Sequence, residues 1–198
     1  PRITIPNPTM SKGKINVSAD NIFPIIKKFL YSDHEIFLRE LISNAVDATQ
    51  KLKTLSNLGE IKRELGDLTI QVIVDKKKKQ LRVIDNGIGM TSDDVKKYIN
   101  DLAFSGATEF VKKYEDSVDA STLIGNFGLG FYSSFMVASQ VDVVSRKAGE
   151  DKAFMWSSDG HGEFTIEDAE GDGRGTTVTL HLNKDDKEYL DETRLEHV

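Results

Sequence analysis

The sequence predicts an α+β fold, a two-layer sandwich in which helices cover one face of a mostly antiparallel sheet. Two observations predict it. Helical patterns come first, a β-hairpin pattern follows, and after further helical patterns the chain ends in a run of strand patterns joined by short turns. In addition, the 198 residues are 38% hydrophobic and 29% charged, which is typical of one globular domain with a substantial core.

The composition argues against several classes of protein. The formal net charge of −6 disfavours binding to nucleic acid or to an anionic membrane through bulk charge. The absence of cysteine excludes disulfides and thiol catalysis and is compatible with the cytoplasm. The four histidines are scattered, and no segment resembles a signal peptide or a membrane span. We therefore expect a cytoplasmic protein without nucleic-acid or membrane partners.

The first elements are an extended piece and two helices. The extended piece lies near residues 14–17, and Ser18-Ala-Asp20 offers N-cap chemistry for a helix over 21–30. The second helix contains FLRELISNAVDA and runs over about 37–55, because its apolar residues recur at helical spacing.

A β-hairpin and a capped helix come next. The alternating, β-branched stretch 68–75 and the stretch 81–86 predict two strands, and the lysines at 76–79 predict a solvated turn between them. Thr91-Ser-Asp-Asp94 is expected to cap a helix over 95–104.

The last third of the chain predicts a glycine-rich segment, a buried helix and four strands. Residues 105–130 are rich in Gly, Ser, Thr and Asp, and FYSSFMVA over 131–138 is apolar enough for a buried helix. The four expected strands are 140–147, 153–160, 162–169 and 175–182.

The helix over 37–55 carries an unusual polar stripe. At about 100° per residue, Glu40, Asn44 and Asp47 fall on one narrow side of the helix, with no lysine or arginine among them. The stripe is consistent with a solvated outer face. It is also consistent with a site that needs oxygen ligands and a base.

A first glycine motif follows the hairpin. Asp85-Asn-Gly-Ile-Gly-Met90 comes directly after a strand, and its glycines permit a tight turn and close backbone approach to a ligand. A carboxylate there can accept a hydrogen bond from an exocyclic amine such as that of adenine. An ordinary Asp-Asn-Gly turn remains the alternative.

Two further glycine motifs lie later in the chain. Gly125-Asn-Phe-Gly-Leu-Gly130 precedes an apolar helix, where exposed backbone N–H groups favour a phosphate. The motif is not the lysine-bearing P-loop, and its context does not fit a dinucleotide fold. Gly173-Arg-Gly-Thr176 precedes the last strand, and its threonine hydroxyl can meet a buried carboxylate or bound water. Each motif alone is also consistent with a plain turn.

The ordered set of motifs is far more specific than any one of them. ExxxNxxD on a helix, DxGxG after a strand, GxxGxG before a helix and GT on a late strand resemble the ATP-binding fold shared by gyrase-type topoisomerases, heat-shock-protein-90 chaperones, sensor histidine kinases and the mismatch-repair protein MutL. YSDHEIFLRELISNAVDA, VIDNGIGMT, AFSGATEF, IGNFGLGFYSSFMVA and GRGTTVTLHL resemble the N-terminal ATP-binding domain of the heat-shock-protein-90 molecular chaperones, from about Lys14 to Val198. AVDATQKLKTL and AFSGA resemble most a bacterial member, of the high-temperature protein G type.

This resemblance implies roles for individual residues. Glu40 matches the general base that activates the attacking water, Arg39 an arginine that helps to hold it, and Asn44 the oxygen ligand of Mg²⁺. Arg39 is also consistent with a plain surface ion pair. Asp85 matches the residue that receives the adenine amine. The other implied nucleotide-binding residues are Asp47 in a water network, Gly89 and Thr176 beside a water at the adenine, Met90 and Phe131 in the pocket wall, and Gly125, Gly128 and Gly130 around the phosphates.

The resemblance also implies a domain organisation. We expect residues 1–9, before Met10, to be an appended tail and residues 10–198 to be the nucleotide-binding domain, with a lid at about 103–130. The family's middle and C-terminal domains are not in this sequence. Since the middle domain supplies an arginine to the γ-phosphate in the family, we expect the chain to bind ATP or ADP but to hydrolyse ATP slowly.

The sequence departs from the family pattern at the predicted lid. Phe104 stands where the family often has a lysine, and Tyr98 where an asparagine is common, with Asn100 as the candidate substitute. We therefore expect no contact from Phe104 to the phosphates or ribose, and Tyr98 does not offer the polar contact of the asparagine.

The function implied is that of an ATPase domain in a heat-shock, stress-response chaperone that assists protein folding. Its cofactors would be ATP or ADP and Mg²⁺, and its partners client proteins and a second protomer of a dimer. The alternatives are a DNA-associated ATPase of the gyrase B or MutL type and a histidine kinase catalytic domain. The acidic charge disfavours a DNA partner.

Overall fold

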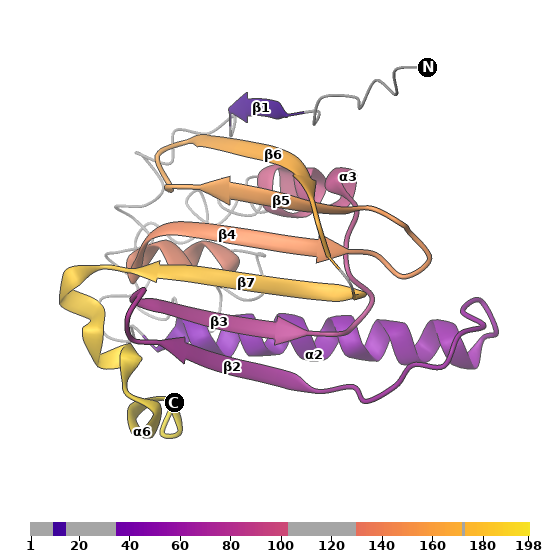
Figure 1. The fold of residues 1–198 in the computed structure, drawn as a ribbon, viewed down its shortest axis with the longest axis horizontal. Coiled ribbons are helices and arrows are strands. Elements are labelled where there is room, and N and C mark those ends of the chain that lie inside the picture. Colours follow the sequence, from indigo (N-terminus) through magenta and orange to yellow (C-terminus); the bar gives the residue numbers. More distant parts are fainter. Residues whose placement is uncertain (1–9, 15–34, 103–129, 172) are drawn as a thin grey trace, which may run out of the picture.

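The computed structural model describes residues 10–14, 35–171 except 103–129, and 173–198. The chain forms a sheet with helices on one face, as Figure 1 shows. The elements in chain order are β1 (Ser11–Lys14), α2 (Ile36–Asn57), β2 (Ile70–Asp75), β3 (Gln80–Asp85), α3 (Ser92–Val95), the π-helix η1 (Lys96–Leu102), the 3₁₀ helix η2 (Gly130–Met136), β4 (Ala138–Arg146), β5 (Ala153–Ser158), β6 (Glu163–Ala169), β7 (Gly175–Leu182), the 3₁₀ helix η3 (Lys184–Leu190) and α6 (Glu192–Leu195).

The seven strands form one sheet in the order β1-β6-β5-β4-β7-β3-β2, and every neighbouring pair is antiparallel. The last strand in sequence, β7, therefore lies in the middle of the sheet between β4 and β3. This arrangement brings the end of β3 beside the start of β7, with Asp85 opposite Thr176. The predicted α+β two-layer sandwich is confirmed.

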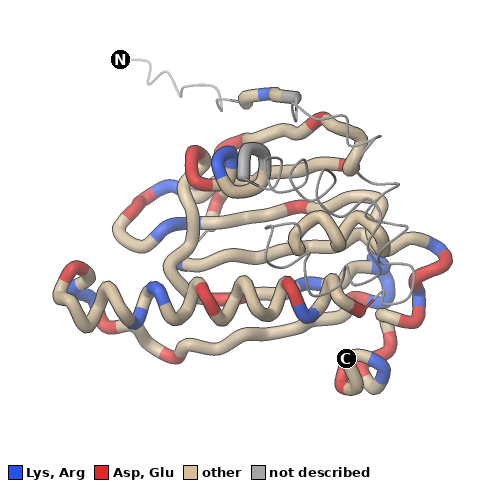
Figure 2. Tube along the Cα trace, turned by 180° about the vertical axis from the view of Figure 1, so that it is seen from behind, with Lys and Arg blue, Asp and Glu red and all other residues tan. Residues whose placement is uncertain are grey.

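The hydrophobic core lies between α2 and the sheet. Helix α2 buries Phe37, Leu41 and Leu52 on the side that faces the strands. Alternate residues of the strands point back at it, with Leu81 and Leu180 fully buried. Figure 2, seen from the helix side, shows α2 crossing the sheet with both acidic and basic residues along its length. This amphipathic pattern is what predicted the helix from its sequence.

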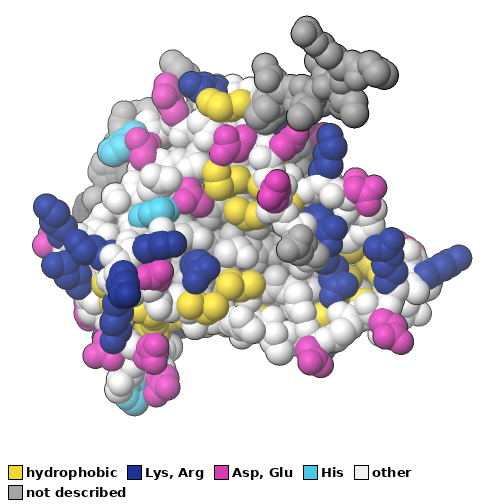
Figure 3. Space-filling model, in the orientation of Figure 1, with side chains coloured by type: hydrophobic (Ala, Val, Ile, Leu, Met, Phe, Trp, Pro, Cys, Tyr) yellow, Lys and Arg dark blue, Asp and Glu magenta, His cyan; other side chains and the backbone are white. Residues whose placement is uncertain are grey.

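The opposite face of the sheet carries no helix in the described part of the chain. Figure 3 shows acidic, basic, histidine and hydrophobic side chains mixed over it. Asp142 lies there and accepts hydrogen bonds from Ser157, at 2.6 Å, and Gln140, at 2.8 Å. Antiparallel sheets commonly leave one face to solvent in this way. No helix among the described residues is long and apolar enough to cross a membrane.

Several predicted elements differ from the structure in type or in their bounds. The helix predicted over 95–104 begins with the expected capping box of Thr91 and Asp94 but is α-helical only to Val95, after which η1 continues it. The buried helix predicted over 131–138 is instead η2, of the 3₁₀ type, and ends at Met136. The next strand begins at Ala138, because pairing with Leu182 of β7 draws that residue into the sheet.

Other differences lie at the two ends of the chain. Of the extended piece predicted near residues 14–17 only Lys14 is described, and it is the last residue of β1, which begins at Ser11 and pairs with β6. The helix predicted over 21–30 lies outside the described residues. Helices η3 and α6, after β7, were not predicted at all.

Candidate functional site

A cavity of about 480 Å³ lies between α2 and the sheet, within the size range of small-molecule sites. Its walls come from α2, the segment between β3 and α3, η1, η2 and the centre of the sheet. The cavity brings together segments that are far apart in the sequence. The predicted site residues that line it are Glu40, Asn44, Asp47, Asp85, Gly89, Met90, Gly130, Phe131 and Thr176.

The polar stripe of α2 forms one wall of this cavity. Glu40 is partly buried, whereas Asn44 and Asp47 are exposed on the cavity side. Burial raises the pKa of the Glu40 carboxyl above its ordinary value. The two interpretations of the stripe therefore describe the same surface, because the solvated face of α2 is also a cavity wall.

Glu40 contacts the backbone at the start of η2. A Cβ atom added at Gly130 would overlap the Glu40 carboxylate, so a side chain at this position would displace it. Gly130 is buried, and α2 packs against η2 here. Glycine at this position therefore leaves room for the Glu40 carboxylate against the backbone of η2.

Asp85 lies at the end of β3, on the opposite wall of the cavity. It is only 8% exposed. Burial raises the pKa of its carboxyl to about 6, although hydrogen bonds from the backbone N–H groups of Gly87 and Thr176 oppose the rise. The carboxylate oxygen accepts the Gly87 bond at 2.9 Å. A buried acceptor of this kind suits a ligand that donates a hydrogen bond.

Ser145 connects three parts of this wall and was not singled out from the sequence. Its hydroxyl accepts from the N–H of Met90 at 2.9 Å, donates to the carbonyl of Gly175 at 3.1 Å and lies 2.8 Å from the hydroxyl of Thr176. It is 1% exposed. The alternation of β4 was the available signal, because Val141, Val143 and Ser145 occupy consecutive core-facing positions.

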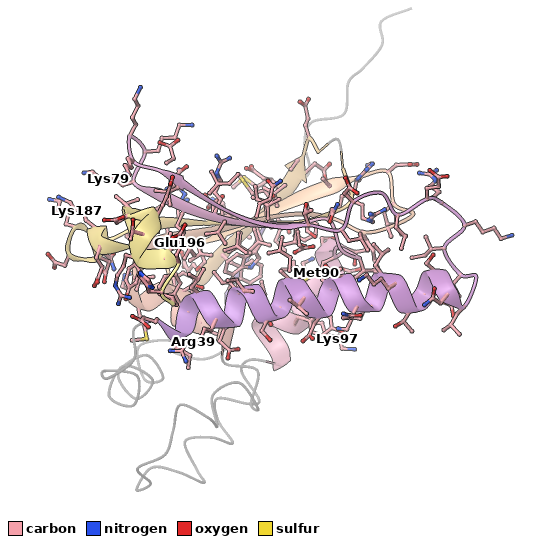
Figure 4. The ribbon with its side chains drawn as sticks, turned by 90° about the horizontal axis from the view of Figure 1, so that it is seen from below. Arg39, Lys79, Met90, Lys97, Lys187 and Glu196 are labelled. Carbon is pink, nitrogen blue, oxygen red and sulfur yellow. The ribbon has the colours of Figure 1, made fainter. Side chains whose placement is uncertain are left out.

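The turn that carries Met90 is fixed by a close backbone approach. Gly89 has a φ of +69°, and a Cβ atom there would overlap the carbonyl of Arg146. The loop after β3 can therefore lie against the end of β4 only with glycine at this position. Figure 4 shows Met90 between α2 and the sheet.

The rim of the cavity carries cationic side chains that sequence reasoning also missed. Lys147 pairs with Asp94 at 2.9 Å. Burial opposes a fall in the pKa of Asp94, but hydrogen bonds from Lys147 and Thr91 outweigh it and lower that pKa. Lys51 lies over the ring of Tyr98, with its Nζ 5.8 Å from the ring centroid. Since α2 carries Lys51 and η1 carries Tyr98, this contact joins two walls of the cavity.

The remaining predicted site residues are Gly125, Gly128 and Arg39. Gly125 and Gly128 lie outside the described residues, as does the predicted lid apart from Gly130. The guanidinium of Arg39 lies 4.0 Å from Glu35 in an i,i+4 pair, and Figure 4 shows it on the side of α2 away from the sheet.

Two residues named in connection with the departures from the family pattern, Phe104 and the candidate substitute Asn100, lack a full description. Phe104 is not described, nor is the side chain of Asn100. The part of the chain that the structure describes holds no cluster of three or more His, Asp or Glu residues arranged for a metal.

Comparison with known proteins agrees with this geometry. Residues 31–186 match the family described as histidine kinase-, DNA gyrase B-, and HSP90-like ATPase. The chain is 55% identical over 186 residues to the chaperone protein HtpG of Porphyromonas gingivalis strain W83, an alignment that covers 93% of this chain and 27% of that protein. It is 55% identical over 187 residues to HtpG of Bacteroides thetaiotaomicron, covering 94% and 27%. It is 50% identical over 181 residues to HtpG of Roseobacter denitrificans, covering 89% and 29%.

The chain thus spans between a quarter and a third of the length of these relatives. Their names confirm the predicted resemblance to bacterial heat-shock-protein-90 chaperones. The family match covers well over half of the sequence and includes α2, the loop after β3 and the strand that bears Thr176. The chain therefore belongs to the family of histidine kinase-, DNA gyrase B- and HSP90-like ATPases.

Proposed function

We propose that this chain is the nucleotide-binding domain of an ATP-dependent molecular chaperone of the heat-shock-protein-90 type. It binds ATP or ADP in the cavity under α2, and hydrolysis of ATP drives a conformational cycle in the whole protein. The observation that carries the proposal is that two carboxylates with different tasks, those of Asp85 and Glu40, lie on opposite walls of one cavity. The names and extent of the relatives support the chaperone context.

Asp85 recognises the adenine base. Its buried carboxylate accepts a hydrogen bond from the exocyclic amine of adenine, and at pH 7 the pKa of about 6 leaves it mostly ionised for this task. Thr176 supplies a hydroxyl beside it for the ring nitrogens or a bridging water, and the buried Ser145 lies within hydrogen-bond distance of that hydroxyl. A guanine base would present a carbonyl oxygen at the same point, and two acceptors would then face each other. The site therefore favours adenine over guanine.

Glu40 acts as the general base for hydrolysis. A base works best when its pKa lies near the operating pH, and burial moves the pKa of Glu40 in that direction. Its position beside the backbone of Gly130 supports a role at the phosphate end of the nucleotide. The carboxylate would accept the proton of the water that attacks the γ-phosphate.

The same wall suits a magnesium ion. Asn44 lies one helical turn from Glu40 and exposes its side chain to the cavity. Mg²⁺ commonly takes one or two protein oxygens and completes its shell with water and phosphate oxygens, so a single amide oxygen fits this donor set. When bound, the ion would neutralise charge on the phosphates. Asn44 would hold it, and Glu40 would remain free as the base.

The whole protein's partners follow from the same proposal. We infer that it acts on client proteins, works as a dimer with a second copy and resides in the cytoplasm. No feature of the described residues favours the alternatives within the family, a DNA-associated ATPase and a histidine kinase, and the relatives compared with this chain are named chaperones.

Calorimetric titration of Mg-ADP tests the binding proposal. We expect one equivalent to bind the chain and an Asp85→Asn variant to lose most of the affinity, because the amide would offer the adenine amine a weaker, uncharged acceptor. An Asp168→Asn variant is the matched control, since Asp168 is an exposed aspartate of β6 outside the cavity. Equal binding by the parent and Asp85→Asn would refute the assigned base site, and titration with Mg-GDP tests base selectivity.

A further inference from the structure

Helix α2 begins without a local side-chain cap. Glu35 occupies the N-cap position with helical backbone angles, φ −75° and ψ −13°, and its side chain makes no capping hydrogen bond. Such caps normally satisfy the first N–H groups of a helix and fix where it starts. Among the described residues, the first turn of α2 is therefore held by tertiary contacts.

The Glu35 carboxylate is instead bound by an arginine from the far end of the chain. Arg194, in α6, donates from its guanidinium to Glu35, and its Nε donates to Glu188 at 3.2 Å. Both Glu35 and Arg194 are only about one-third exposed or less. Arg39 contacts the same Glu35 carboxylate at 4.0 Å, so two arginines converge on it.

Packing by residues 184–198, which we call the C-terminal segment, reinforces this ion pair. Tyr189 is 1% exposed, and its ring meets that of Phe37 edge-on with the centroids 5.0 Å apart. The Arg194 guanidinium also lies 5.9 Å from the centroid of the Tyr189 ring. Leu195 packs against the core from the same helix as Arg194. Figure 1 shows α6 near the end of the sheet where α2 begins.

The first turn of α2 determines where Glu40 lies. The N–H of Leu38 donates to the carbonyl of Glu35 at 3.1 Å. In the regular helix that follows, the N–H of Glu40 donates to the carbonyl of Ile36, one turn earlier. A shift of residues 35–37 therefore moves the backbone of Glu40. Because the carboxylate lies directly against Gly130, such a shift changes its position relative to the start of η2.

We propose that Arg194 is a positioning residue for hydrolysis, which through Glu35 and Tyr189 holds the first turn of α2 and so keeps the Glu40 carboxylate beside Gly130. The inference rests on the proposed function, since it needs Glu40 to act in hydrolysis. The sheet pairs Asp85 with Thr176, whereas the guanidinium of Arg194 binds at the start of α2. Arg194 therefore serves the hydrolytic step and leaves base recognition unchanged.

The test compares rate and affinity in variants of this chain. Single-turnover hydrolysis of labelled ATP, with protein in excess, gives the rate constant of even a slow step, and calorimetry with Mg-ADP gives the affinity. We expect Arg194→Ala to lower the rate constant by about ten- to a hundredfold, because a misplacement of about 1 Å has such an effect on an oriented reaction. The affinity should stay within about twofold.

Three further variants separate positioning from general damage. Glu35→Gln should reproduce the loss of rate, since it removes the same ion pair from the other side. Arg194→Lys keeps a positive charge that can reach Glu35 and should recover much of the rate. Glu188→Gln is the matched control, because it removes the other carboxylate on Arg194 and leaves Glu35 paired. Circular dichroism melting verifies that each variant is folded.

Each outcome decides the question. A chain that binds no Mg-ADP refutes the proposed function and the inference together. A chain that binds it but hydrolyses no faster than Glu40→Ala leaves the nucleotide site standing and refutes both the role of Glu40 as the base and the inference, because no Glu40-dependent step exists for Arg194 to serve. An unchanged rate in folded Arg194→Ala, or a parallel loss of rate and affinity, also overturns it. Only a lowered rate with retained affinity, restored by lysine, supports it.

Discussion

The N–H of Gly87 donates a hydrogen bond of 2.9 Å to the carboxylate of Asp85, two residues earlier at the end of β3. The backbone after β3 thus turns around the Asp85 carboxylate, which lies at the end of the strand and lines the cavity. This bond and the one from the N–H of Thr176 compensate only part of the cost of burying the charge. The buried acceptor therefore lowers the stability of the fold at neutral pH.

Stability should depend on pH through Asp85. The pKa of its carboxyl is about 6 in the folded protein against an ordinary value of 3.8, so the folded state holds the proton more tightly than the unfolded chain. The contribution of this group is fully present below pH 3.8 and is lost as pH rises to about 6. Urea unfolding at pH 4 and pH 7 measures it.

The Asp85→Asn variant provides the comparison, since its side chain does not titrate. The stability of the parent relative to this variant should fall between pH 4 and pH 7 by on the order of 3 kcal/mol. The Asp168→Asn control should show no such change. A constant difference between the parent and Asp85→Asn across this range would mean that the carboxyl of Asp85 is not perturbed by burial.

Replacing Glu40 should separate hydrolysis from binding. Glu40→Gln keeps the size of the side chain but removes the base, and we expect ATP hydrolysis to fall by roughly 10²- to 10⁴-fold. The affinity for Mg-ADP should change little, because the adenine contacts lie on the other wall. In the parent, the rate should rise with pH through the raised pKa of Glu40 as the carboxylate becomes available. A variant with parental turnover would exclude Glu40 as the base.

A methyl group at Gly130 should act through Glu40. Gly130→Ala places its Cβ where the Glu40 carboxylate lies, so the carboxylate must move and hydrolysis should fall at least tenfold. Gly173→Ala is the matched control, since a Cβ there meets nothing within 4 Å. Measured turnover of the two variants decides the point, and equal rates would show that Glu40 can relocate without consequence.

Loss of the Ser145 hydroxyl should destabilise the adenine side of the cavity. Ser145→Ala leaves the buried N–H of Met90 and the hydroxyl of Thr176 without this partner, at a cost of about 1–3 kcal/mol. Ser139→Ala, which removes an exposed hydroxyl from the same strand, should change the free energy of unfolding by less than about 0.5 kcal/mol. Chemical denaturation measures both, and similar values for the two would contradict a role for Ser145 in holding this wall.

Local sequence patterns predicted the elements whose structure depends on nearby residues. The periodicity of FLRELISNAVDA predicted α2, which extends only two residues beyond its expected end near Leu55. Alternation and the lysine turn predicted β2 and β3, and the capping box at Thr91 predicted the start of α3. These succeed because hydrogen bonds and side-chain periodicity within one segment set the outcome.

The same patterns failed where distant contacts decide. The stretch FYSSFMVA is apolar enough for an α-helix, but it forms η2 and gives up Ala138 to the sheet, because pairing with Leu182 competes with helical bonding. The capping residues predicted where α3 begins, but nothing in them predicts that it continues as the π-helix η1. Elements η3 and α6 were not predicted because their main contacts, such as Tyr189 against Phe37, lie about 150 positions away in the chain.

By itself the sequence determined the α+β class, the family and the residues of the two acidic walls, because motifs retain their order and spacing along the chain. It also predicted which face of α2 is polar. Only the tertiary structure decided that Glu40 lies against Gly130, that Ser145 joins Met90 to Thr176 and that Arg194 reaches Glu35. Those contacts form only in the folded chain, in which the last strand, β7, lies in the centre of the antiparallel sheet. Arg194 and Glu35 are 159 positions apart, and no periodic pattern in the sequence predicts a contact over that separation.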